Sequence, residues 1–453
     1  ENLIKEGVDV LRINFSHSTH KEAKFLIKSI REINHSMSTN IAILADLQGP
    51  KLRIGEVDKN TQLSDGDKVL IKTDKCFKGN EKKLYLNYQN LGEDIKKNEK
   101  ILIDDGKIIL KVLNINNKNE VLTEVIQGGE LSSNKGFNLP NTFLSQPALT
   151  DKDIDDAIFS AKHNVDWIAL SFVRKGSDIK SLVKLLEKNT DHRIPVIAKI
   201  EKPDGVKNID EIMKYASGIM VARGDLGVEI NAAEVPLIQK KLVNKAKKAR
   251  IPVIIATQMM ESMMKSLNPN RAEVNDVANS IMDGADAVML SGETSMGDHP
   301  MEVIRTISRI IGRVENSELI SLKHKHPSDY ESDRFITKSV CYYAAKIAND
   351  TKAKAISTLT NSGYTAYQIS SWRPKTHVLV FTSNKRILTQ LNLLWGVKAF
   401  YYDGTESTDK TIEEINKLAV DNNLLQKDDK VVNLTSMPIE KKGMVNTVRV
   451  SKI

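Results

Sequence analysis

Seven apolar runs recur along the first 294 residues, and each ends in charged or small polar residues. The runs occupy residues 10–17, 41–51, 167–173, 195–201, 218–227, 252–260 and 286–294. Helical periodicity follows the short, β-branched or alanine-rich core of each run, which predicts parallel strands that alternate with helices. Five of the six intervals between run ends fit the ~31 residues per unit of an eight-unit β/α barrel.

The sixth interval, from Asp46 to Ser171, is about four units long by the same measure. Glycines punctuate short segments within it, such as residues 68–72 and 107–115. Short strands between frequent turn residues predict an antiparallel β domain. We therefore expect residues 51–148 to form an inserted β-barrel lid, and residues 1–50 and 149–318 to form a TIM barrel.

A second alternation of helices and strands fills the rest of the chain. Its expected helices are 334–350, 363–371, 385–394 and 408–423, and its expected strands are 353–359, 377–383, 397–402 and 430–436. This pattern predicts a doubly wound α/β domain over residues 319–453. A barrel needs eight strands, and residues 1–9 have the pattern of a helix that should follow a first strand. We therefore expect a further strand before residue 1, without which the barrel would have exposed edges and lower stability.

Composition narrows the class of protein. A chain of 453 residues is too long for one hydrophobic core, and its 40% apolar and 27% charged residues are ordinary for a globular protein. The net charge of +8 comes from scattered lysines with few interleaved aromatics, which does not indicate nucleic-acid binding. No apolar stretch approaches the ~20 residues of a membrane span, and no signal-peptide pattern begins the chain. With only Cys76 and Cys341, far apart, we expect a soluble cytoplasmic protein that does not bind membranes.

Three residues at neighbouring run ends indicate a metal site. Lys199 and Glu201 are two apart on one expected strand, so their side chains project to the same side, and Asp225 ends the next strand. Two carboxylates beside an ammonium group suit Mg²⁺ or Mn²⁺ and a substrate on which charge develops. The Lys199 and Glu201 spacing alone is equally compatible with a structural ion pair. Gly224 strengthens the functional interpretation, because it permits close approach to an anion at the start of a helix.

Further polar residues end the other runs. Arg12, Asn14 and Ser16 alternate along one expected strand, so guanidinium, amide and hydroxyl groups share a face. Arg53 follows at the start of the insertion, and two arginines at one mouth suit phosphate binding. Thr257 and Ser291 place hydroxyl groups at the same rim.

The chain resembles the pyruvate kinase family over almost its entire length. The motifs that carry the resemblance are RINFSH (12–17), ADLQGPK (45–51), SNKGFNLP (133–140), SFVRK (171–175), KIEKPDG (199–205), VARGDLGVEI (221–230), ATQMMESM (256–263), the segment 268–300 and TNSGYTA (360–366). The resemblance implies transfer of the phosphoryl group of phosphoenolpyruvate to ADP, giving pyruvate and ATP. It also implies a homotetramer with a C-terminal regulatory domain.

The resemblance assigns roles residue by residue. Glu201 and Asp225 match the family's divalent-metal ligands, and Lys199 matches the lysine that stabilises the transferring phosphoryl group and the developing enolate. Arg12 matches the arginine that binds the substrate phosphate. The N–H groups of Gly224 and Asp225, with Thr257, match the group that holds the substrate carboxylate, and Thr257 or Ser291 is expected to organise the water that delivers a proton. The expected nucleotide contacts are Asn14, Ser16, His17, Arg53 and Lys135.

One departure concerns potassium. Potassium-dependent members resemble DTKGPEIR where this chain has DLQGPKLR at 46–53, so Lys51 replaces an acidic residue. The expected cation cage consists of Asn14, Ser16, Asp46 and the Leu47 carbonyl. A tethered ammonium group can supply the charge of K⁺, so we expect activity without K⁺, as in a lysine-containing subgroup.

The C-terminal domain contains a candidate effector loop that opens a helix. Its residues are Thr358, Thr360, Asn361, Ser362, Gly363 and Thr365. Hydroxyl and main-chain N–H groups at a helix start suit a phosphate. Because Asn361 stands where forms activated by fructose bisphosphate can have lysine, we expect a sugar monophosphate or AMP. An ordinary capped helix is an equally good interpretation.

Two other functions remain as alternatives at this stage. Another Mg²⁺-dependent enolpyruvate barrel, of the aldolase or malate synthase type, also uses Glu and Asp on neighbouring strands, but it lacks the inserted lid. A catalytically silent metabolite sensor or RNA-binding protein on the same scaffold would not need Lys199, Glu201, Asp225 and Thr257 together.

Overall fold

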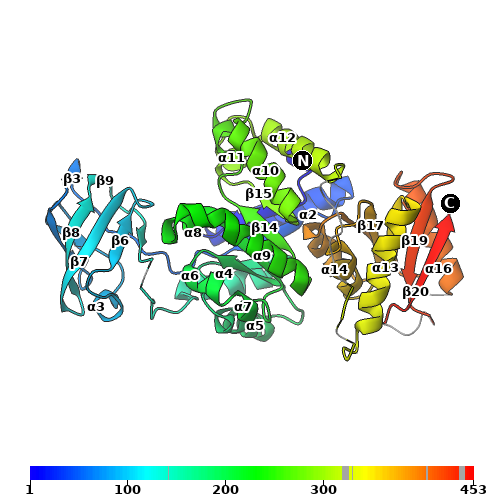
Figure 1. The fold of residues 1–453 in the computed structure, drawn as a ribbon, viewed down its shortest axis with the longest axis horizontal. Coiled ribbons are helices and arrows are strands. Elements are labelled where there is room, and N and C mark those ends of the chain that lie inside the picture. The colour runs from blue at the N-terminus through cyan, green and yellow to red at the C-terminus, as the bar shows by residue number, and fades with distance from the viewer. Residues whose placement is uncertain (141, 319–325, 329, 405–406, 438–443) are drawn as a thin grey trace.

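The chain folds around three sheets that lie in a row. The computed structural model describes residues 1–140, 142–318, 326–328, 330–404, 407–437 and 444–453. Within these residues the sheets have seven, six and five strands, and a separate two-stranded pair accompanies the six-stranded sheet. Figure 1 shows the six-stranded sheet at one end of the long axis, the seven-stranded sheet in the middle and the five-stranded sheet at the other end.

The seven predicted strands of the central sheet are confirmed. All of its strand pairs are parallel, and the strands pair in chain order. They are β1 (Val10–Asn14), β2 (Ala42–Asp46), β11 (Trp167–Leu170), β12 (Val196–Ile200), β13 (Gly218–Ala222), β14 (Val253–Ala256) and β15 (Ala287–Met289). Parallel strands place their carboxyl ends on one edge, so the polar residues that end each run meet there.

The helices between these strands cover the outside of the curled sheet, as in a TIM barrel. They are α2 (His20–Met37), α4 (Asp151–Lys162), α5 (Gly176–Asn189), α6 (Pro203–Lys207), α7 (Ile209–Ile212), α8 (Arg223–Glu229), α9 (Val235–Ala249), α10 (Arg271–Asp283), α11 (Gly292–Ser295) and α12 (Pro300–Glu315). The opening helix α1 (Asn2–Lys5) is shorter than the helix predicted for residues 1–9. Gly7 follows it at φ +107°, a left-handed conformation that ends a helix and that glycine adopts without strain.

Side chains of the central strands alternate between two hydrophobic clusters. Ile43, Ala45 and their counterparts on other strands pack outward against the helices. Leu44, Trp167 and Met220 point inward and pack against each other in the barrel interior. This alternation explains why the runs are largely apolar, because the five inner strands are buried on both faces, whereas the edge strands β1 and β15 are only partly buried.

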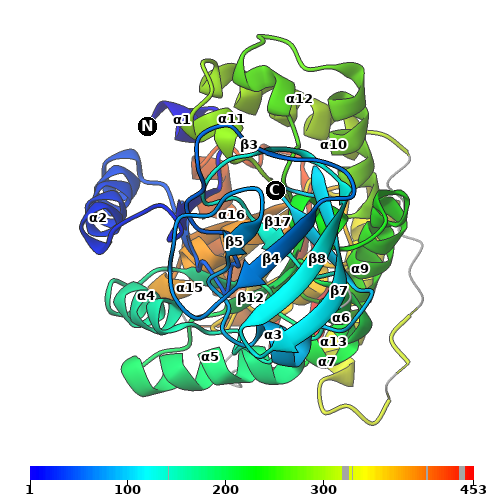
Figure 2. The same cartoon turned by 90° about the vertical axis from the view of Figure 1, so that its left-hand side faces the viewer.

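The inserted segment leaves after β2 and returns before β11, although these two strands pair directly. Its sheet has the order β10-β6-β7-β8-β4-β5, and it faces the viewer in Figure 2. The strands of the insertion are β3 (Thr61–Leu63), β4 (Lys68–Lys72), β5 (Lys83–Tyr85), β6 (Lys100–Ile103), β7 (Ile108–Asn117), β8 (Glu120–Gln127), β9 (Gly129–Leu131) and β10 (Phe137–Asn138), with the short helix α3 (Leu91–Asp94). The insertion has a hydrophobic core of its own.

The C-terminal sheet has the order β18-β17-β16-β19-β20. Its elements are α13 (Phe335–Thr351), β16 (Ala355–Leu359), α14 (Tyr364–Ser370), β17 (His377–Thr382), α15 (Lys385–Gln390), β18 (Val397–Tyr401), α16 (Thr408–Asp421), β19 (Lys430–Thr435) and β20 (Thr447–Lys452). All four predicted strands are present. The antiparallel edge strand β20 was not predicted, and its residues are only partly buried.

The C-terminal sheet and its helices contact the amino ends of the barrel strands. Leu393 and Tyr367 belong to the hydrophobic cluster inside the barrel. The Trp167 indole Nε1 donates a hydrogen bond of 3.2 Å to the Gln390 carbonyl. The barrel mouth, at the other end of the strands, faces the insertion (Figure 1). Among the described helices, none has both the length and the apolar character that a membrane crossing requires.

Candidate active site

Polar side chains from neighbouring strands meet at the carboxyl edge of the barrel. The Lys199 ammonium Nζ lies 3.0 Å from Glu201 Oε1 and 3.2 Å from Asp46 Oδ1. It also donates a 2.7 Å hydrogen bond to the Ser171 hydroxyl. β12 supplies Lys199, Glu201 directly follows the end of β12, and β2 supplies Asp46, so the predicted convergence of strand ends brings these groups together.

The charges around Lys199 fix its protonation. Burial lowers the pKa of Lys199, but the adjacent carboxylates of Asp46 and Glu201 outweigh this effect and raise the pKa above its ordinary value. The lysine side chain is 12% exposed, and both carboxylate side chains are 1% exposed. Lys199 is therefore a permanent cation at neutral pH, suited to electrostatic stabilisation and unsuited to act as a base.

Asp46 is held by a second cation. The Arg12 Nε donates to Asp46 Oδ2 at 2.6 Å, so this buried carboxylate bridges Arg12 and Lys199. Asn14 follows on the same strand, and its Oδ1 accepts the Ser16 N–H at 3.1 Å. His17 is exposed beside them, and its N–H donates to the Asn14 carbonyl.

The Leu47 carbonyl, predicted to belong to a cation cage, accepts a 2.7 Å hydrogen bond from the Ser171 hydroxyl. Ser171 thus contacts both this carbonyl and Lys199. Sequence reasoning assigned no role to Ser171, although the motif SFVRK contains it. Its contribution depends on a tertiary contact that no local pattern specifies.

Glu201 is fixed at both carboxylate oxygens. Oε1 contacts Lys199, and Oε2 accepts the Phe172 N–H at 2.6 Å. Burial raises the pKa of Glu201, the charge of Lys199 opposes this rise, and the charge of Asp225 adds to it. Two mutually repelling carboxylates are a natural receptor for a cation, because binding relieves the repulsion.

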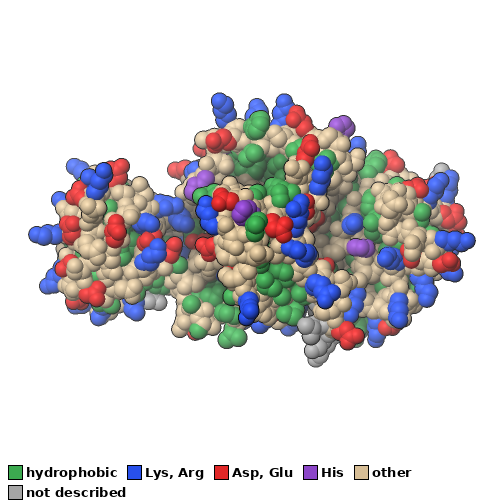
Figure 3. Space-filling model, turned by 90° about the horizontal axis from the view of Figure 1, so that it is seen from above, with side chains coloured by type: hydrophobic (Ala, Val, Ile, Leu, Met, Phe, Trp, Pro, Cys, Tyr) green, Lys and Arg blue, Asp and Glu red, His purple; other side chains and the backbone are tan. Residues whose placement is uncertain are grey.

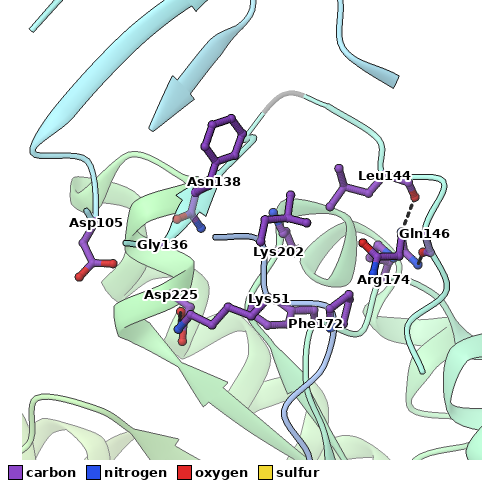
Figure 4. Close-up of a pocket in the computed structure, with 13 residues that line it drawn as sticks. Lys51, Asp105, Gly136, Asn138, Leu144, Gln146, Phe172, Arg174, Lys202 and Asp225 are labelled. Carbon is purple, nitrogen blue, oxygen red and sulfur yellow. Dashed lines mark hydrogen bonds and ion pairs between the residues drawn. The ribbon is translucent and has the colours of Figure 1, made fainter. Parts of the chain in front are cut away.

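Asp225 lies in the first turn of α8, and its side chain is 32% exposed. The Lys51 Nζ lies 3.8 Å from Asp225 Oδ1. Figure 4 shows Lys51 extending towards Asp225 across a pocket that Phe172 and Lys202 also line. The structure therefore places the Lys51 ammonium next to a predicted metal ligand, whereas Arg12 and Lys199 are the cations that contact Asp46.

The donor set suits a divalent cation that also binds its substrate. Among the described residues, no group of three or more His, Cys, Asp or Glu side chains could hold a metal alone. Mg²⁺ commonly takes one or two carboxylates and completes its octahedron with water and substrate oxygens. The two carboxylates predicted for this role are Glu201, which is buried, and Asp225, which lines the pocket.

The chain adopts left-handed backbone conformations around this site. Phe172 has φ +54°, Thr257 has φ +72° and Gln258 has φ +54°. Such conformations are unfavourable for bulky or β-branched residues and cost about 1–3 kcal/mol each, so surrounding contacts must hold them. At Thr257 one such contact is visible, because the Gly224 N–H donates to Thr257 Oγ1 at 2.8 Å. Gly224 and Thr257, predicted as one group, are thus in contact.

Ser291 lies at the start of α11. Its N–H donates to Glu293 Oε2 at 2.7 Å, and Glu293 Oε1 accepts the Met260 N–H at 3.2 Å. Glu293 therefore joins the loop after β15 to the loop that contains Thr257. Because Ser291 follows the carboxyl end of β15, it lies at the rim of the barrel, as predicted.

Arg53 and Lys135 lie on the insertion. Arg53 Nη1 donates to the Asn134 carbonyl at 2.9 Å, and Lys135 pairs with Asp104 at 2.9 Å. Arg53 also lines an open surface pocket of about 450 Å³ that residues of the insertion form. These contacts of Arg53 and Lys135 lie within the insertion. The structure therefore does not bring Arg53 into contact with Arg12, although the two arginines were predicted to converge.

The candidate effector loop lies between β16 and α14. The Gly363 N–H donates to Thr360 Oγ1 at 3.1 Å, and Gly363 has φ +79°. The Asn361 carbonyl accepts a hydrogen bond from Asn384 Nδ2 at 3.2 Å. Thr358 and Thr365 are buried, whereas Ser362 is exposed.

Two family models match the chain. The first is described as pyruvate kinase, barrel domain, and matches residues 1–304. The second is described as pyruvate kinase, alpha/beta domain, and matches residues 338–451.

Curated and solved relatives agree with these matches. The pyruvate kinase of Corynebacterium efficiens is 39% identical over 449 residues, which cover 99% of this chain and 93% of that protein. The pyruvate kinase of Geobacillus stearothermophilus is 39% identical over 457 residues, 100% of this chain and 77% of that protein. A crystal structure of a pyruvate kinase from Cryptosporidium parvum superposes with a TM-score of 0.92 at 31% identity, covering 100% of this chain and 92% of the other.

Proposed function

The chain belongs to the pyruvate kinase family, and on that premise we propose that the cluster around Lys199 and Glu201 is its catalytic centre. The enzyme is a glycolytic phosphotransferase that moves the phosphoryl group of phosphoenolpyruvate to ADP, giving pyruvate and ATP. The observation that carries the assignment of the site is the Lys199 ammonium, buried within 3.2 Å of two carboxylates at the barrel mouth.

The family depends on a divalent metal ion, and we assign Glu201 and Asp225 as its protein ligands, with Mg²⁺ as the physiological ion and Mn²⁺ as a substitute. Bound there, the ion would neutralise phosphoryl oxygens and act as a Lewis acid. Lys199 then stabilises the charge on the phosphoryl group in transit and on the enolate that remains. Arg12 binds the phosphate of the substrate. Phosphoryl transfer depends mostly on such positioning and charge neutralisation.

The remaining roles concern the two substrates. The N–H groups of Gly224 and Asp225 hold the substrate carboxylate together with Thr257. After transfer, enolpyruvate takes a proton at carbon from a water that Thr257 or Ser291 orients. The nucleotide is contacted by a set from the barrel and the insertion, comprising Asn14, Ser16, His17, Arg53 and Lys135. Because Arg53 and Lys135 lie on the insertion, their role requires the lid to approach the barrel when ADP binds.

We further propose that K⁺ is not required. Lys51 places a tethered ammonium 3.8 Å from Asp225 and within the pocket that lies between lid and barrel. This fixed charge stands in for the monovalent cation that Asn14, Ser16, Asp46 and the Leu47 carbonyl would otherwise bind. Replacing K⁺ with a bulky organic cation should therefore leave the rate unchanged, and a strict loss of activity would contradict the proposal.

The domain division that we propose follows the three hydrophobic cores. Residues 1–50 and 149–318 form the barrel, 51–148 the lid, and 319–453 the C-terminal domain, with the boundary at 319 outside the described residues. The loop from Thr358 to Thr365 is assigned to a sugar monophosphate or AMP. Titrating a sugar monophosphate and AMP into the wild type and the Thr360→Glu variant tests this assignment. If the variant is still activated despite its added negative charge, the loop does not bind the effector.

We propose a cytoplasmic homotetramer, since glycolysis is a cytoplasmic pathway and since large apolar side chains are exposed on the barrel and on the C-terminal domain. On the barrel, Leu237, Leu267 and Met296 are 69%, 58% and 75% exposed. Figure 3 shows hydrophobic side chains at the surface of the central lobe, among charged ones. On the C-terminal domain, Ile336 and Val450 are 52% and 47% exposed. Light scattering coupled to size exclusion measures the subunit number, and a monomer at micromolar concentration would contradict the tetramer.

A coupled assay for pyruvate tests the catalytic assignment. Pyruvate should form from phosphoenolpyruvate only when ADP and Mg²⁺ are both present. A lyase of the aldolase type would not need ADP, and a silent sensor would form no pyruvate. Substitution of Glu201 by Gln should abolish the Mg²⁺-dependent rate, and an unchanged rate would contradict the assignment of this residue.

A further inference from the structure

We propose that Arg223 is a positioning residue for Thr257, the residue that the proposed function places on the substrate carboxylate. Arg223 begins α8, directly before Gly224 and Asp225. Its guanidinium lies against the loop that follows β14 and does not need to touch substrate. The proposal rests on the role proposed for Thr257, and it goes beyond that role by naming the group that sets the conformation of this residue.

The contacts of Arg223 span three segments. Nη2 donates to the Thr257 carbonyl at 2.7 Å and approaches Met259 Sδ at 3.0 Å. Nη1 pairs with Asp276 Oδ1 at 2.5 Å. The arginine side chain is 13% exposed, so water does not compete strongly for these partners. Arg223 thus joins α8 to the loop after β14 and to α10.

Thr257 needs such a restraint. Its φ of +72° is unfavourable for a β-branched residue, and the next residue, Gln258, is also left-handed. Left alone, the peptide would relax towards the right-handed or extended region, and its hydroxyl would turn away. Arg223 binds the Thr257 carbonyl while the Gly224 N–H binds the Thr257 hydroxyl, so consecutive residues of α8 hold both ends of the same threonine.

The packing at Gly224 shows how close this fit is. A Cβ atom at Gly224 would lie 3.3 Å from Thr257 Oγ1, tighter than an ordinary contact. The first turn of α8 therefore performs two tasks. It presents Asp225 to the metal and fixes Thr257 relative to that metal through Arg223 and Gly224.

The anchor on α10 gives a role to a helix that contains none of the residues assigned to catalysis. Asp276 belongs to the segment 268–300, whose helix contains no residue assigned to substrate. Another acidic residue of the same helix, Glu273, accepts hydrogen bonds from the Ser262 N–H at 2.7 Å and the Ser262 hydroxyl at 2.5 Å. α10 therefore holds the loop after β14 at two points, and Asp276 does so through Arg223.

A double-mutant cycle tests the proposal in the full chain. Arg223→Gln should lower kcat by about 10- to 100-fold, the loss expected from a misplacement of about 1 Å, with the KM for ADP within about twofold. Thr257→Ala should lower kcat as well. Because both substitutions remove the same placed hydroxyl, the double variant should be no slower than the slower single variant. Arg223→Lys, which can reach one partner but not both, should be intermediate.

A second readout isolates the chemistry. An enzyme that protonates enolpyruvate also exchanges the methyl hydrogens of pyruvate with solvent, since the reverse step uses the same groups. Arg223→Gln should slow this exchange, followed by proton NMR in deuterium oxide, by the same factor as kcat. A merely structural role would lower the amount of folded enzyme without this matched change.

Arg373→Gln is the matched control, because Arg373 is also a buried arginine paired with a carboxylate, Asp286 at 2.7 Å, but away from the mouth. It should lower the melting temperature, and its effect on kcat should multiply with that of Thr257→Ala. If Arg223→Gln does not fold, Asp276→Ala should give the same non-additive cycle. Multiplicative losses for Arg223 or Asp276 with Thr257 would overturn the inference alone, whereas an unimpaired Thr257→Ala would overturn both the inference and the role of Thr257.

Discussion

Substitution of Lys199 by Met is the sharpest test of the catalytic centre. The ammonium lies 3.0 Å from Glu201 and 3.2 Å from Asp46. At an effective dielectric constant of about 20, each contact represents roughly 5 kcal/mol of direct attraction. Desolvation offsets most of this attraction in the wild type. The variant leaves two buried carboxylates with one fewer cation, so its free energy of unfolding should fall by about 3–5 kcal/mol.

The catalytic loss should be far larger than this loss of stability. A cation that neutralises a transferring phosphoryl group contributes about 10³–10⁵ to kcat. Metal binding should persist, because Glu201 and Asp225 are unchanged and one repelling charge has been removed. We therefore expect the variant to bind Mn²⁺ at pH 8 at least as tightly as the wild type, as measured by electron paramagnetic resonance. We also expect it to form pyruvate at least about 1,000-fold more slowly, which is the lower bound of the charge effect.

The matched control is Lys247→Met, which removes a partly buried lysine of α9 whose Nζ donates to the Asp283 carbonyl at 2.9 Å. This variant should lose some stability and keep its kcat within a few fold. The reasoning would be refuted by a folded, metal-binding Lys199→Met enzyme that retains more than a tenth of the wild-type rate.

Three further outcomes follow from the charges and burial described above. Lys51→Glu should create a requirement for K⁺ in steady-state assays, because it replaces the tethered ammonium near Asp225 with a carboxylate; a rate that stays independent of K⁺ would count against Lys51. Arg53→Met should raise the KM for ADP by about 10-fold, as for a lost charge-assisted contact, and leave the KM for phosphoenolpyruvate unchanged; equal changes in both constants would contradict a nucleotide role. Burial raises the pKa of Cys341 to about 12, against a smaller opposing effect of Arg250. The folded state therefore keeps the Cys341 proton between about pH 9 and 12, whereas the unfolded state loses it, so the free energy of unfolding should fall as pH rises through this range. A thiol reagent at pH 8 should modify only the exposed Cys76 in the native enzyme and both cysteines in urea.

The barrel strands were predictable because the five inner strands are buried on both faces and the partly buried edge strands β1 and β15 belong to equally short runs that end in polar residues. A short apolar run that ends in polar residues leaves few alternatives in a β/α pattern, and all seven runs are strands of one sheet. The same logic predicted that the side chains of Lys199, in β12, and Glu201, directly after β12, lie together. In contrast, β20 is a partly buried edge strand, and its sequence therefore lacks the apolar pattern that marks the others.

The supporting residues of the site could not be predicted in the same way. Ser171 contacts Lys199 through its hydroxyl, Phe172 contacts Glu201 from a left-handed backbone conformation, and Arg223 contacts a carbonyl 34 residues away in the chain. Such contacts depend on tertiary geometry, which hydrophobic periodicity does not encode. The contacts of Arg53 depend on the folding of the insertion, so the position of Arg53 at the start of the insertion did not reveal them.

Leu393 and Tyr367 of the C-terminal domain pack into the hydrophobic cluster inside the barrel, and we refer to these two side chains as the plug. The plug couples the stability of the C-terminal domain to that of the barrel. Neither the barrel interior nor these two side chains can be exposed to water without exposing the other, so the barrel and the C-terminal domain should melt in one cooperative transition. The lid is enclosed by its own apolar side chains and has no share in that plug. Calorimetry of this enzyme should therefore resolve a small, separate endotherm for the lid, because the lid can open without loosening the rest of the molecule.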